Sequence, residues 1–238
     1  MAEPSFELPP TLPPTAEPAR APEPRRKSVI REYVEAMLIA LGLALFIRTF
    51  FLQAYKIPSG SMERTLLIGD HILVNKIIYG LRMPESIFGL KPPGFPYGQY
   101  LFQIEPVHRR DIVVFVFPPD RTKDFIKRVI GVGGDTVEVK DKAVYVNGQK
   151  LDEPYTRYED GEGGASATPR DDFGPVTVPE GKLFVMGDNR DRSYDSRFCG
   201  FVDRSDVEGR ALIVYWSWDG DEAWPLPVRW RRFGRLVR

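Results

Sequence analysis

The chain has 238 residues, which is enough for one sizeable folded domain with appendages. Hydrophobic residues make up 42% and charged residues 28%, so most of the chain is expected to fold. Lysine plus arginine and aspartate plus glutamate both number 33, so the chain lacks the basic excess of a nucleic-acid-binding protein. One cysteine excludes an intrachain disulfide, and one cysteine with two histidines argues against a structural zinc site. We expect no metal and no cofactor.

The first 24 residues are rich in proline, alanine and glutamate and show almost no apolar periodicity. Such a segment cannot bury enough surface to offset the entropy lost on ordering, so it is expected to be disordered. Basic residues follow at Arg25, Arg26, Lys27 and Arg31. We therefore expect residues 1–27 to form a disordered, proline-rich tail that carries a basic cluster.

An apolar run covers residues 34–52 and is interrupted by Glu35 near its start and Arg48 near its end. Its uninterrupted part, residues 36–47, is shorter than the roughly 20 residues of an ordinary membrane span. Counting from residue 33 to residue 52 reaches that length, since Glu35 lies near one end and the long Arg48 side chain can extend to the other interface. The sequence therefore predicts a transmembrane anchor helix over residues 28–53.

A buried core helix and a cleaved signal peptide would both show a similar apolar run. No clear small-x-small cleavage site follows the run, and a long tail precedes it, which argues against the signal peptide. The basic cluster on the N-terminal flank predicts a cytoplasmic N-terminus, although Arg48 and Lys56 on the far flank weaken this bias. Residues 54–238 are then expected to form an extracytoplasmic domain.

Beyond the anchor, short runs of β-branched and aromatic residues alternate with turn residues, which is typical of strands joined by turns. Asn147-Gly148, at the end of one run, is a strong hairpin signal. We expect a mostly β domain built from a curved antiparallel sheet, with long loops over residues 81–110 and 156–172. The expected strands lie within residues 71–80, 111–119, 124–135, 136–149, 182–188 and 211–218.

Ser59-Gly60-Ser61 follows closely after the predicted anchor and is preceded by Pro58. Proline restricts the backbone before this turn, and glycine relieves steric limits within it. The turn can therefore present a serine side chain while aiming nearby N–H groups outward. By spacing alone, such a tripeptide is more often a plain loop.

Lys127 and Arg128 are adjacent in the segment Phe-Ile-Lys-Arg-Val-Ile, residues 125–130. In a strand, alternation puts Lys127 and Arg128 on opposite faces, so one of the two cations must lie among apolar side chains. An exposed edge is the ordinary place for a lysine. A desolvated lysine would instead have a lowered pKa and could act as a base near neutral pH.

Residues 187–197 contain six charged residues and two serines directly after an expected strand. A solvated loop can have this composition. Alternating aspartate and arginine also suit a network of ion pairs and hydrogen bonds, which would fix the loop rigidly.

Together, four segments in order resemble the type I signal peptidases, also called leader peptidases. Residues 57–62, with Ile68-Gly69-Asp70, resemble the nucleophile segment of that family. Residues 110–115 resemble the next segment, residues 125–131 with Gly134-Asp135 the lysine segment, and residues 187–200 the last. The match spans residues 46–218, and four such segments in order behind a predicted anchor are highly specific.

The resemblance implies a signal-peptidase fold and a membrane-bound serine endopeptidase that removes N-terminal signal peptides from exported preproteins. It implies that Ser61 is the nucleophile and Lys127 the general base. Ser59, with the Ser61 N–H, would bind the oxyanion, and Ser193 would orient the lysine amine. The remaining roles fall to Asp195 and Arg197, which would brace the site, and to Ile57, Pro58, Phe125 and Ile126, which would line the pocket for a small substrate residue.

The chain departs from the family at Arg64, where the family usually has a proline that stiffens the chain behind the nucleophile. The resemblance also implies the partners, which are preproteins with small residues before the cut and the lipid bilayer, without nucleic acid. It implies a single-pass protein of the bacterial cytoplasmic membrane with a cytoplasmic N-terminus. The arginine- and aromatic-rich residues 224–238 either rest on lipid headgroups or pack on the β domain.

Three other functions remain open from the sequence. A histidine-based hydrolase would use His71 or His108, neither of which lies in a recognisable catalytic context. A self-cleaving repressor with Ser-Lys chemistry would need a DNA-binding segment and no membrane anchor. A non-catalytic, anchored β module would function without Ser61 and Lys127.

Overall fold

A computed structural model of the chain describes residues 29–83, 93–94, 98–159, 169–219 and 228–238. The expected tail, residues 1–27, lies outside these residues, as do parts of both expected loops and of the stretch 224–238. The chain divides into two compact units, residues 1–41 and 42–238. Helix α1, Val29–Phe50, runs across the boundary between them, and its length and mean hydropathy are sufficient for a membrane span.

The residues that follow α1 are mostly β, as the sequence predicts, and each expected strand segment contains a strand. The short helices are η1 (Gly60–Met62), α2 (Ser196–Cys199), η2 (Arg204–Asp206) and η3 (Trp230–Arg232). The strands are β1 (Leu52–Lys56), β2 (Asp70–Asn75), β3 (Gly80–Arg82), β4 (Tyr100–Gln103), β5 (Ile112–Val116), β6 (Asp124–Val132), β7 (Thr136–Lys140), β8 (Ala143–Val146), β9 (Gln149–Lys150), β10 (Phe173–Thr177), β11 (Lys182–Met186), β12 (Val202–Asp203), β13 (Val207–Ser217) and β14 (Arg235–Leu236).

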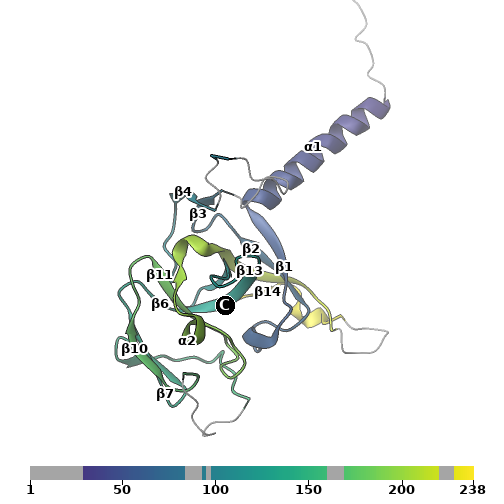
Figure 1. The fold of residues 1–238 in the computed structure, drawn as a ribbon. Helices are drawn as coiled ribbons and strands as arrows, with labels where there is room; N and C mark the ends of the chain where they lie inside the picture. The colour runs from purple at the N-terminus through teal and green to yellow at the C-terminus, as the bar shows by residue number, and fades with distance from the viewer. Residues whose placement is uncertain (1–28, 84–92, 95–97, 160–168, 220–227) are drawn as a thin grey trace, which may run out of the picture. The chain divides into compact units, whose positions relative to one another are not determined.

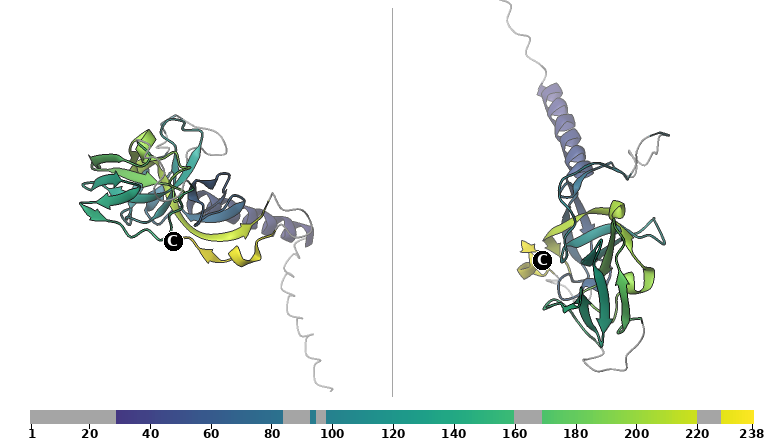
Figure 2. Two further views of the ribbon diagram at one scale, coloured as in Figure 1. Left: turned by 90° about the horizontal axis from the view of Figure 1, so that it is seen from below. Right: turned by 90° about the vertical axis from the view of Figure 1, so that its left-hand side faces the viewer.

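The larger sheet has the strand order β1-β2-β13-β5-β6-β11-β12, with β14 paired to β13, and every neighbouring pair is antiparallel (Figure 1). Register shifts interrupt β13 where it pairs with β2 and where it pairs with β5. Such bulges bend a strand and increase its twist, and the yellow-green β13 curves visibly in Figure 2. The sheet is therefore curved and antiparallel, which confirms the predicted fold class.

A smaller sheet has the strand order β10-β7-β8-β9, and β3 pairs with β4 separately. Asn147 and Gly148 form the turn between β8 and β9, with φ values of 53° and 77°. Two residues with positive φ between paired strands make the tight turn that the Asn-Gly sequence favours, so the hairpin prediction is confirmed. The smaller sheet packs on the larger one through a buried cluster that includes Ile130 of β6, Val137 of β7 and Phe184 of β11.

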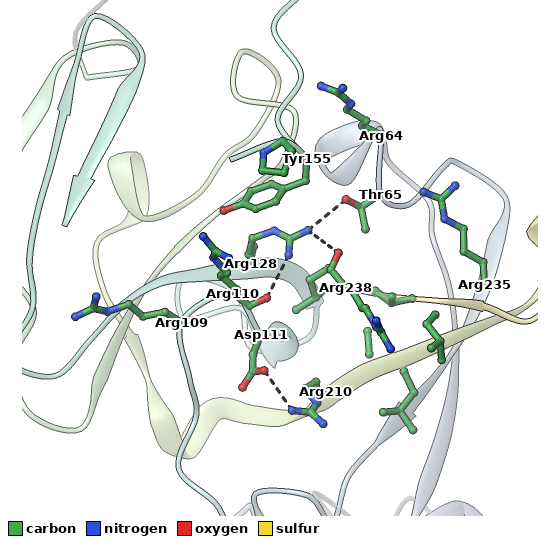
Figure 3. Close-up of a pocket in the computed structure, with 16 residues that line it drawn as sticks. Arg64, Thr65, Arg109, Arg110, Asp111, Arg128, Tyr155, Arg210, Arg235 and Arg238 are labelled. Atoms are coloured by element: carbon green, nitrogen blue, oxygen red, sulfur yellow. Dashed lines mark hydrogen bonds and ion pairs between the residues drawn. The ribbon is translucent and has the colours of Figure 1, made fainter. Parts of the chain in front are cut away.

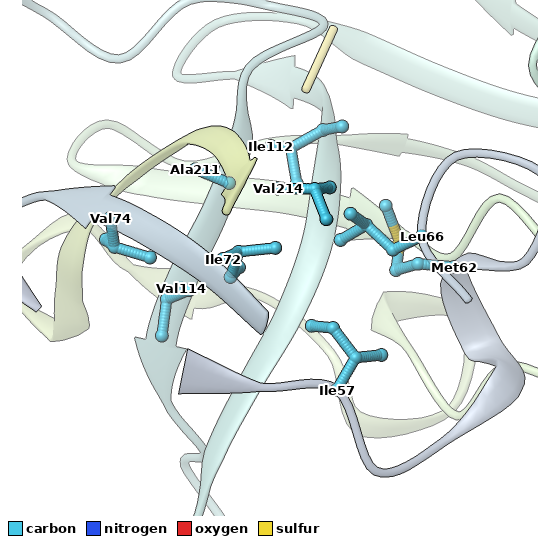
Figure 4. Close-up of a cluster of buried hydrophobic side chains, with 9 residues drawn as sticks. All are labelled: Ile57, Met62, Leu66, Ile72, Val74, Ile112, Val114, Ala211 and Val214. Atoms are coloured by element: carbon cyan, nitrogen blue, oxygen red, sulfur yellow. The ribbon is translucent and has the colours of Figure 1, made fainter. Parts of the chain in front are cut away.

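One buried apolar cluster holds the Ser61 segment on the larger sheet (Figure 4). Met62, the last residue of η1, and Leu66, which follows it, are completely buried, and Ile57 is 2% exposed. Burying a side chain of this size contributes roughly 1.5–3 kcal/mol, so the segment is fixed by packing before and after Ser61. The sheet residues of this cluster are Ile72, Val74, Ile112, Val114, Ala211 and Val214.

Candidate active site

The Ser61 segment is a loop between β1 and β2 that backbone hydrogen bonds close at its base. Ile57 N donates to the Asp70 carbonyl oxygen at 2.8 Å, and Gly69 N donates to the Ile57 carbonyl oxygen at 3.0 Å. The Ser61 carbonyl oxygen accepts a hydrogen bond from Asn189 N at 3.0 Å. The loop that carries Ser61 is therefore tied both to its own hairpin and to the segment that follows β11.

Lys127 lies in the middle of β6, where its side chain is buried and 4% of the residue is exposed. Its Nζ donates a hydrogen bond to Ser61 Oγ at 2.8 Å and another to the Ile126 carbonyl oxygen at 3.0 Å. Ser61 is itself 8% exposed. The tertiary structure thus brings a hydroxyl and an amine from distant parts of the sequence into contact in a largely desolvated position.

Burial lowers the pKa of Lys127 to about 8, because desolvation disfavours the ammonium form. The negative charges of Asp195 and Asp188 act in the opposite direction and limit the shift. The Phe125 ring adds to the apolar surroundings, with its centroid 5.3 Å from Nζ. Near pH 8 a substantial fraction of the amine is therefore neutral and able to accept a proton.

The segment 187–197 forms a buried network rather than a solvated loop. Asp195 and Arg197 make a bidentate ion pair in which both N···O distances are 2.9 Å. Asp195 also accepts a hydrogen bond from Gly187 N at 3.0 Å and caps α2 through Arg197 N. Although burial raises the pKa of Asp195, its hydrogen bond and ion pair with Arg197 hold that pKa below its usual value.

Gly187 lies where this network meets the Ser61 loop. A Cβ atom at this position would lie 2.3 Å from Ser193 Oγ and 2.5 Å from the Ser61 carbonyl oxygen, so only glycine fits without displacement. Ser193 is buried, and its hydroxyl makes no hydrogen bond of normal geometry among the described residues, although it lies close enough to Asp195 to help lower the pKa of that carboxyl. Sequence analysis placed Gly187 in a motif but gave it no role, because a close approach of two segments is a tertiary feature.

Arg128 is 1% exposed and makes a second buried pair that sequence analysis missed. Its Nε and Nη2 donate to the two carboxylate oxygens of Asp188 at 2.8 and 2.7 Å. Thr65 Oγ1 donates to the same carboxylate at 2.5 Å, and the Tyr155 ring centroid lies 3.7 Å from the guanidinium carbon. The sequence predicted that at least one of the two adjacent cations would be buried, and both are, because both faces of β6 are covered. The pair could have been suspected from the sequence, since Arg128 and Asp188 each lie in one of the motif segments.

A pocket of about 410 Å³ opens onto Ser61 and Lys127. Ser59 lies at the exposed N-terminal cap of η1 and lines this pocket. Of the four expected pocket residues, Phe125 is the one that lines it. The other lining residues are Gly60, Glu63, Ile68, Glu159, Asn189, Arg192 and Tyr194.

The other three expected pocket residues lie beside this pocket rather than in its lining. Ile57 and Pro58 line a neighbouring pocket of about 520 Å³, which shares Ile68 with the first. Ile126 packs against the apolar cluster that contains Ile57. His71 lines the neighbouring pocket, and neither His71 nor His108 is among the lining residues of the Ser61 pocket, which argues against a histidine acting as the base for Ser61.

Arg64, the departure from the family pattern, has a backbone φ of 91°. Proline cannot adopt this value, since its ring holds φ near −65°. The turn behind Ser61 therefore has a backbone that differs from that of a proline-containing turn. Its rigidity comes instead from the buried neighbours Met62, Thr65 and Leu66.

Comparison with known proteins identifies relatives along most of the chain. A family model described as "Signal peptidase, peptidase S26" matches residues 30–216. A probable signal peptidase I-2 of Synechocystis sp. is 41% identical over 191 residues, which cover 78% of this chain and 72% of that protein. A signal peptidase I of Bacillus licheniformis is 37% identical over 198 residues, which cover 82% of this chain and 92% of that protein.

A crystal structure of a signal peptidase I from Enterococcus faecalis V583 is 38% identical, covers 45% of this chain and 97% of its own, and has a TM-score of 0.38. The family match runs from α1 into β13 and includes all four motif segments in their order. It spans well over half of the chain, and both curated relatives are covered over more than two thirds of their length. The chain therefore belongs to the signal peptidases of peptidase family S26, which are serine peptidases.

Proposed function

We propose that this signal peptidase is a membrane-bound serine endopeptidase in which Ser61 and Lys127 form the catalytic dyad. The observation that carries the proposal is the 2.8 Å hydrogen bond between Ser61 Oγ and an amine that is 4% exposed. A serine hydroxyl is a poor nucleophile at its free pKa and needs an adjacent base. A lysine whose pKa is lowered to about 8 by burial can supply that base, and Ser-Lys pairs are a known variant of the serine triad.

In the acylation step, neutral Lys127 accepts the Ser61 proton as Oγ attacks the scissile carbonyl carbon. The Ser61 N–H and the Ser59 hydroxyl stabilise the resulting oxyanion, and losing one such donor typically costs on the order of 100- to 1000-fold in rate. The Lys127 ammonium then gives its proton to the leaving amine as the C–N bond breaks. The product of this step is an ester between Ser61 and the signal peptide.

In the deacylation step, Lys127 takes a proton from a water molecule that attacks the ester carbonyl. The bond to Ser61 Oγ breaks, and the proton returns to the serine. We assign Ser193 the orientation of the lysine amine, since its buried hydroxyl lies beside Gly187 and the Ser61 loop. The hydroxyl makes no hydrogen bond to Lys127 in this structure, so the role requires the two groups to meet when substrate binds. Asp195 and Arg197 are positioning residues, because their ion pair fixes the segment that carries Ser193.

The proposed substrates are exported preproteins with small residues before the cut. Strand β1 lies at one edge of the larger sheet and leads directly into the Ser61 loop, so an extended peptide could add to that edge. Alternate side chains would then enter the two adjacent pockets. The residues proposed to contact them are Phe125 in the Ser61 pocket, Ile57 and Pro58 in the neighbouring one, and Ile126 behind them.

We propose that α1 anchors the protein in the bacterial cytoplasmic membrane, with the N-terminus in the cytoplasm and residues 54–238 outside. The length and hydropathy of α1 support the span, and the basic residues before it support the orientation. The lipid bilayer is then a partner that holds the site at the membrane surface where the cleavage end of a signal peptide emerges. Cytosolic proteins would not be cleaved, because they would not reach a site on the outer side of the membrane.

The test uses the detergent-solubilised full chain and a preprotein that bears an Ala-x-Ala cleavage site. Ser61→Ala and Lys127→Ala are each expected to lower the cleavage rate at least about 1000-fold, because each removes a member of a unit that acts together. His71→Ala and His108→Ala are the controls and should keep substantial activity. Similar product from wild type and both dyad variants would overturn the proposal, and loss of activity in a folded histidine variant would favour a histidine-based mechanism.

A further inference from the structure

A second pocket, of about 820 Å³, lies apart from the Ser61 pocket, and seven of its sixteen lining residues are arginines (Figure 3). It shares no lining residue with the Ser61 pocket. The one carboxylate side chain in its lining belongs to Asp111, which pairs with Arg210 and also accepts hydrogen bonds from Tyr79 and the His108 N–H. Its seven arginines are Arg64, Arg109, Arg110, Arg128, Arg210, Arg235 and Arg238.

Three of these arginines are already neutralised by carboxylates. Arg128 pairs with Asp188, Arg109 with Asp135, and Arg210 with Asp111. The guanidinium of Arg128 is fully engaged, since it also donates to Thr65 and to the main-chain oxygens of Arg110 and Arg238. Arg128 therefore forms a fixed wall of the pocket.

The other four arginines make no ion pair with any described carboxylate. Arg64 donates to the Thr156 carbonyl oxygen at 2.7 Å and Arg110 to the Asp152 carbonyl oxygen at 3.3 Å, which leaves both charges unbalanced. Arg235, in β14, and Arg238, two residues after that strand, are exposed and line the pocket. The four come from three separate parts of the chain and line the same pocket, with their side chains spread over its different sides (Figure 3).

The chemistry of this arrangement selects an anion of more than one charge. A single carboxylate would leave three of the four guanidinium groups without a partner. Phosphate offers several oxygens in different directions, and guanidinium groups bind it through paired N–H donors. The lining also has an apolar side, made by Ile112, Ala211, Leu212, Leu236 and Val237, which suits the organic part of a phosphate ester.

We propose that this pocket, which we call the arginine pocket, binds a phosphate-bearing anion. Arg64, Arg110, Arg235 and Arg238 contact the phosphate oxygens, and the paired Arg128 stays in the wall. The ligand can be a soluble phosphate compound or the headgroup of an anionic phospholipid, since both present the same group. The proposal does not depend on the chemistry at Ser61, because the two pockets are lined by different residues.

The test titrates inorganic pyrophosphate into the full chain in uncharged maltoside micelles at low salt and measures heat of binding. Arg235→Gln and Arg238→Gln are each expected to weaken binding about tenfold, and the double variant about 100-fold, because each removes a charged hydrogen bond. The matched control is Arg231→Gln, an exposed arginine of the same segment outside the pocket, which should change the affinity less than twofold. Raising the salt concentration should weaken binding to wild type more than to the double variant.

A second arm distinguishes the sources of the phosphate group. In mixed micelles with phosphatidylglycerol, weaker pyrophosphate binding by wild type identifies a lipid headgroup as a competitor for the pocket. Unchanged binding identifies a soluble phosphate compound. Thermal unfolding checks that the variants fold, and pyrophosphate should raise the melting temperatures of wild type and Arg231→Gln alike, and that of the double variant much less. The proposal would be overturned if wild type did not bind pyrophosphate, or if wild type and the double variant bound it with equal affinity. It would also be overturned if Arg231→Gln lost as much affinity as Arg235→Gln or Arg238→Gln.

Discussion

Lys127 and Arg128 are consecutive residues of β6, and both are buried, on opposite faces of the strand. The Asp188 carboxylate balances the charge of Arg128 and accepts two hydrogen bonds from its guanidinium. Lys127 makes no ion pair with a described carboxylate, and its contacts are the Ser61 hydroxyl and a carbonyl oxygen. Arg128 is thus held in an ion pair, whereas burial shifts Lys127 toward its neutral form. Because of this difference, the two residues can be tested separately.

The first prediction concerns the pH dependence of cleavage. The proposed base works only when it is unprotonated, and burial lowers the pKa of Lys127 to about 8. The value of kcat/KM should therefore rise about tenfold per pH unit below pH 8 and become flat above about pH 9. A rate constant that is independent of pH between 6 and 10, measured with a substrate free of titratable groups near the cut, would contradict the assignment.

The second prediction separates stability from activity at position 127. The folded-state pKa of about 8 lies below the ordinary value of 10.5, so the unfolded chain binds more protons between these pH values. The free energy of unfolding of wild type should therefore rise with pH between about 8 and 10.5. Below pH 8 the folded protein carries the whole free-energy cost of burying a charged amine. Lys127→Met should be inactive, yet more stable than wild type by about 1–3 kcal/mol at pH 7.

Thermal and urea unfolding at pH 7 and at pH 10.5 measure this difference. The advantage of Lys127→Met should shrink at the higher pH, because the wild-type amine is then neutral in the folded state and about half neutral in the unfolded state, so little cost of burying a charge remains. Ser61→Ala is the control, since it removes the other dyad member and leaves the buried amine in place. A Lys127→Met protein that is less stable than wild type at both pH values would argue against a desolvated lysine.

The third prediction concerns the buried pair of Arg128 and Asp188. Asp188→Asn leaves an uncompensated guanidinium in a buried position and should cost about 3–5 kcal/mol of stability. The double variant Arg128→Met/Asp188→Asn should cost less than the sum of the two single variants, because no charge is then left unpaired. The matched control is the exposed pair of Lys182 and Asp203, where Asp203→Asn should change stability by less than about 1 kcal/mol.

Unfolding of the four proteins in urea gives the coupling free energy between Arg128 and Asp188. A coupling near zero would show that the pair contributes nothing beyond two independent side chains. The temperature of unfolding should follow the same order as the urea midpoints.

The fourth prediction concerns Gly187. An alanine there would place Cβ within 2.5 Å of the Ser61 carbonyl oxygen and closer still to Ser193, so the two segments must separate. Gly187→Ala should lower kcat at least about 100-fold, because a small displacement of the nucleophile is enough for such a loss. It should also cost about 1–3 kcal/mol of stability, as overpacking does.

The control for Gly187 is Gly209, where a Cβ would lie 2.3 Å from the Asn75 carbonyl oxygen, away from the Ser61 pocket. Gly209→Ala should lose comparable stability and keep its kcat per folded molecule. Equal activity losses in the two variants would mean that destabilisation alone, rather than the position of Ser61, explains the result.

The amino-acid pattern was sufficient to predict the central strands and their curved antiparallel arrangement, but it missed six of the described strands, including β4, which lies in the expected loop 81–110. Alternating β-branched residues and turn residues act locally, so β2, β5, β6, β11 and β13 could be located without coordinates. The Asn147-Gly148 turn is likewise a local preference, because both residues accept positive φ. The apolar run and its basic flank predicted α1 by length and composition alone.

The contacts of the candidate site depended on the tertiary structure. Spacing could mark Ser61 and Lys127 as motif residues, but their 2.8 Å contact and their burial result from the packing of the β1–β2 loop on β6. The Arg128–Asp188 pair, the role of Gly187 and the arginine pocket arise in the same way, from side chains that are far apart in sequence. Desolvation, close approach and unbalanced charge are properties of a three-dimensional environment, so the sequence could name the residues but not their chemical state.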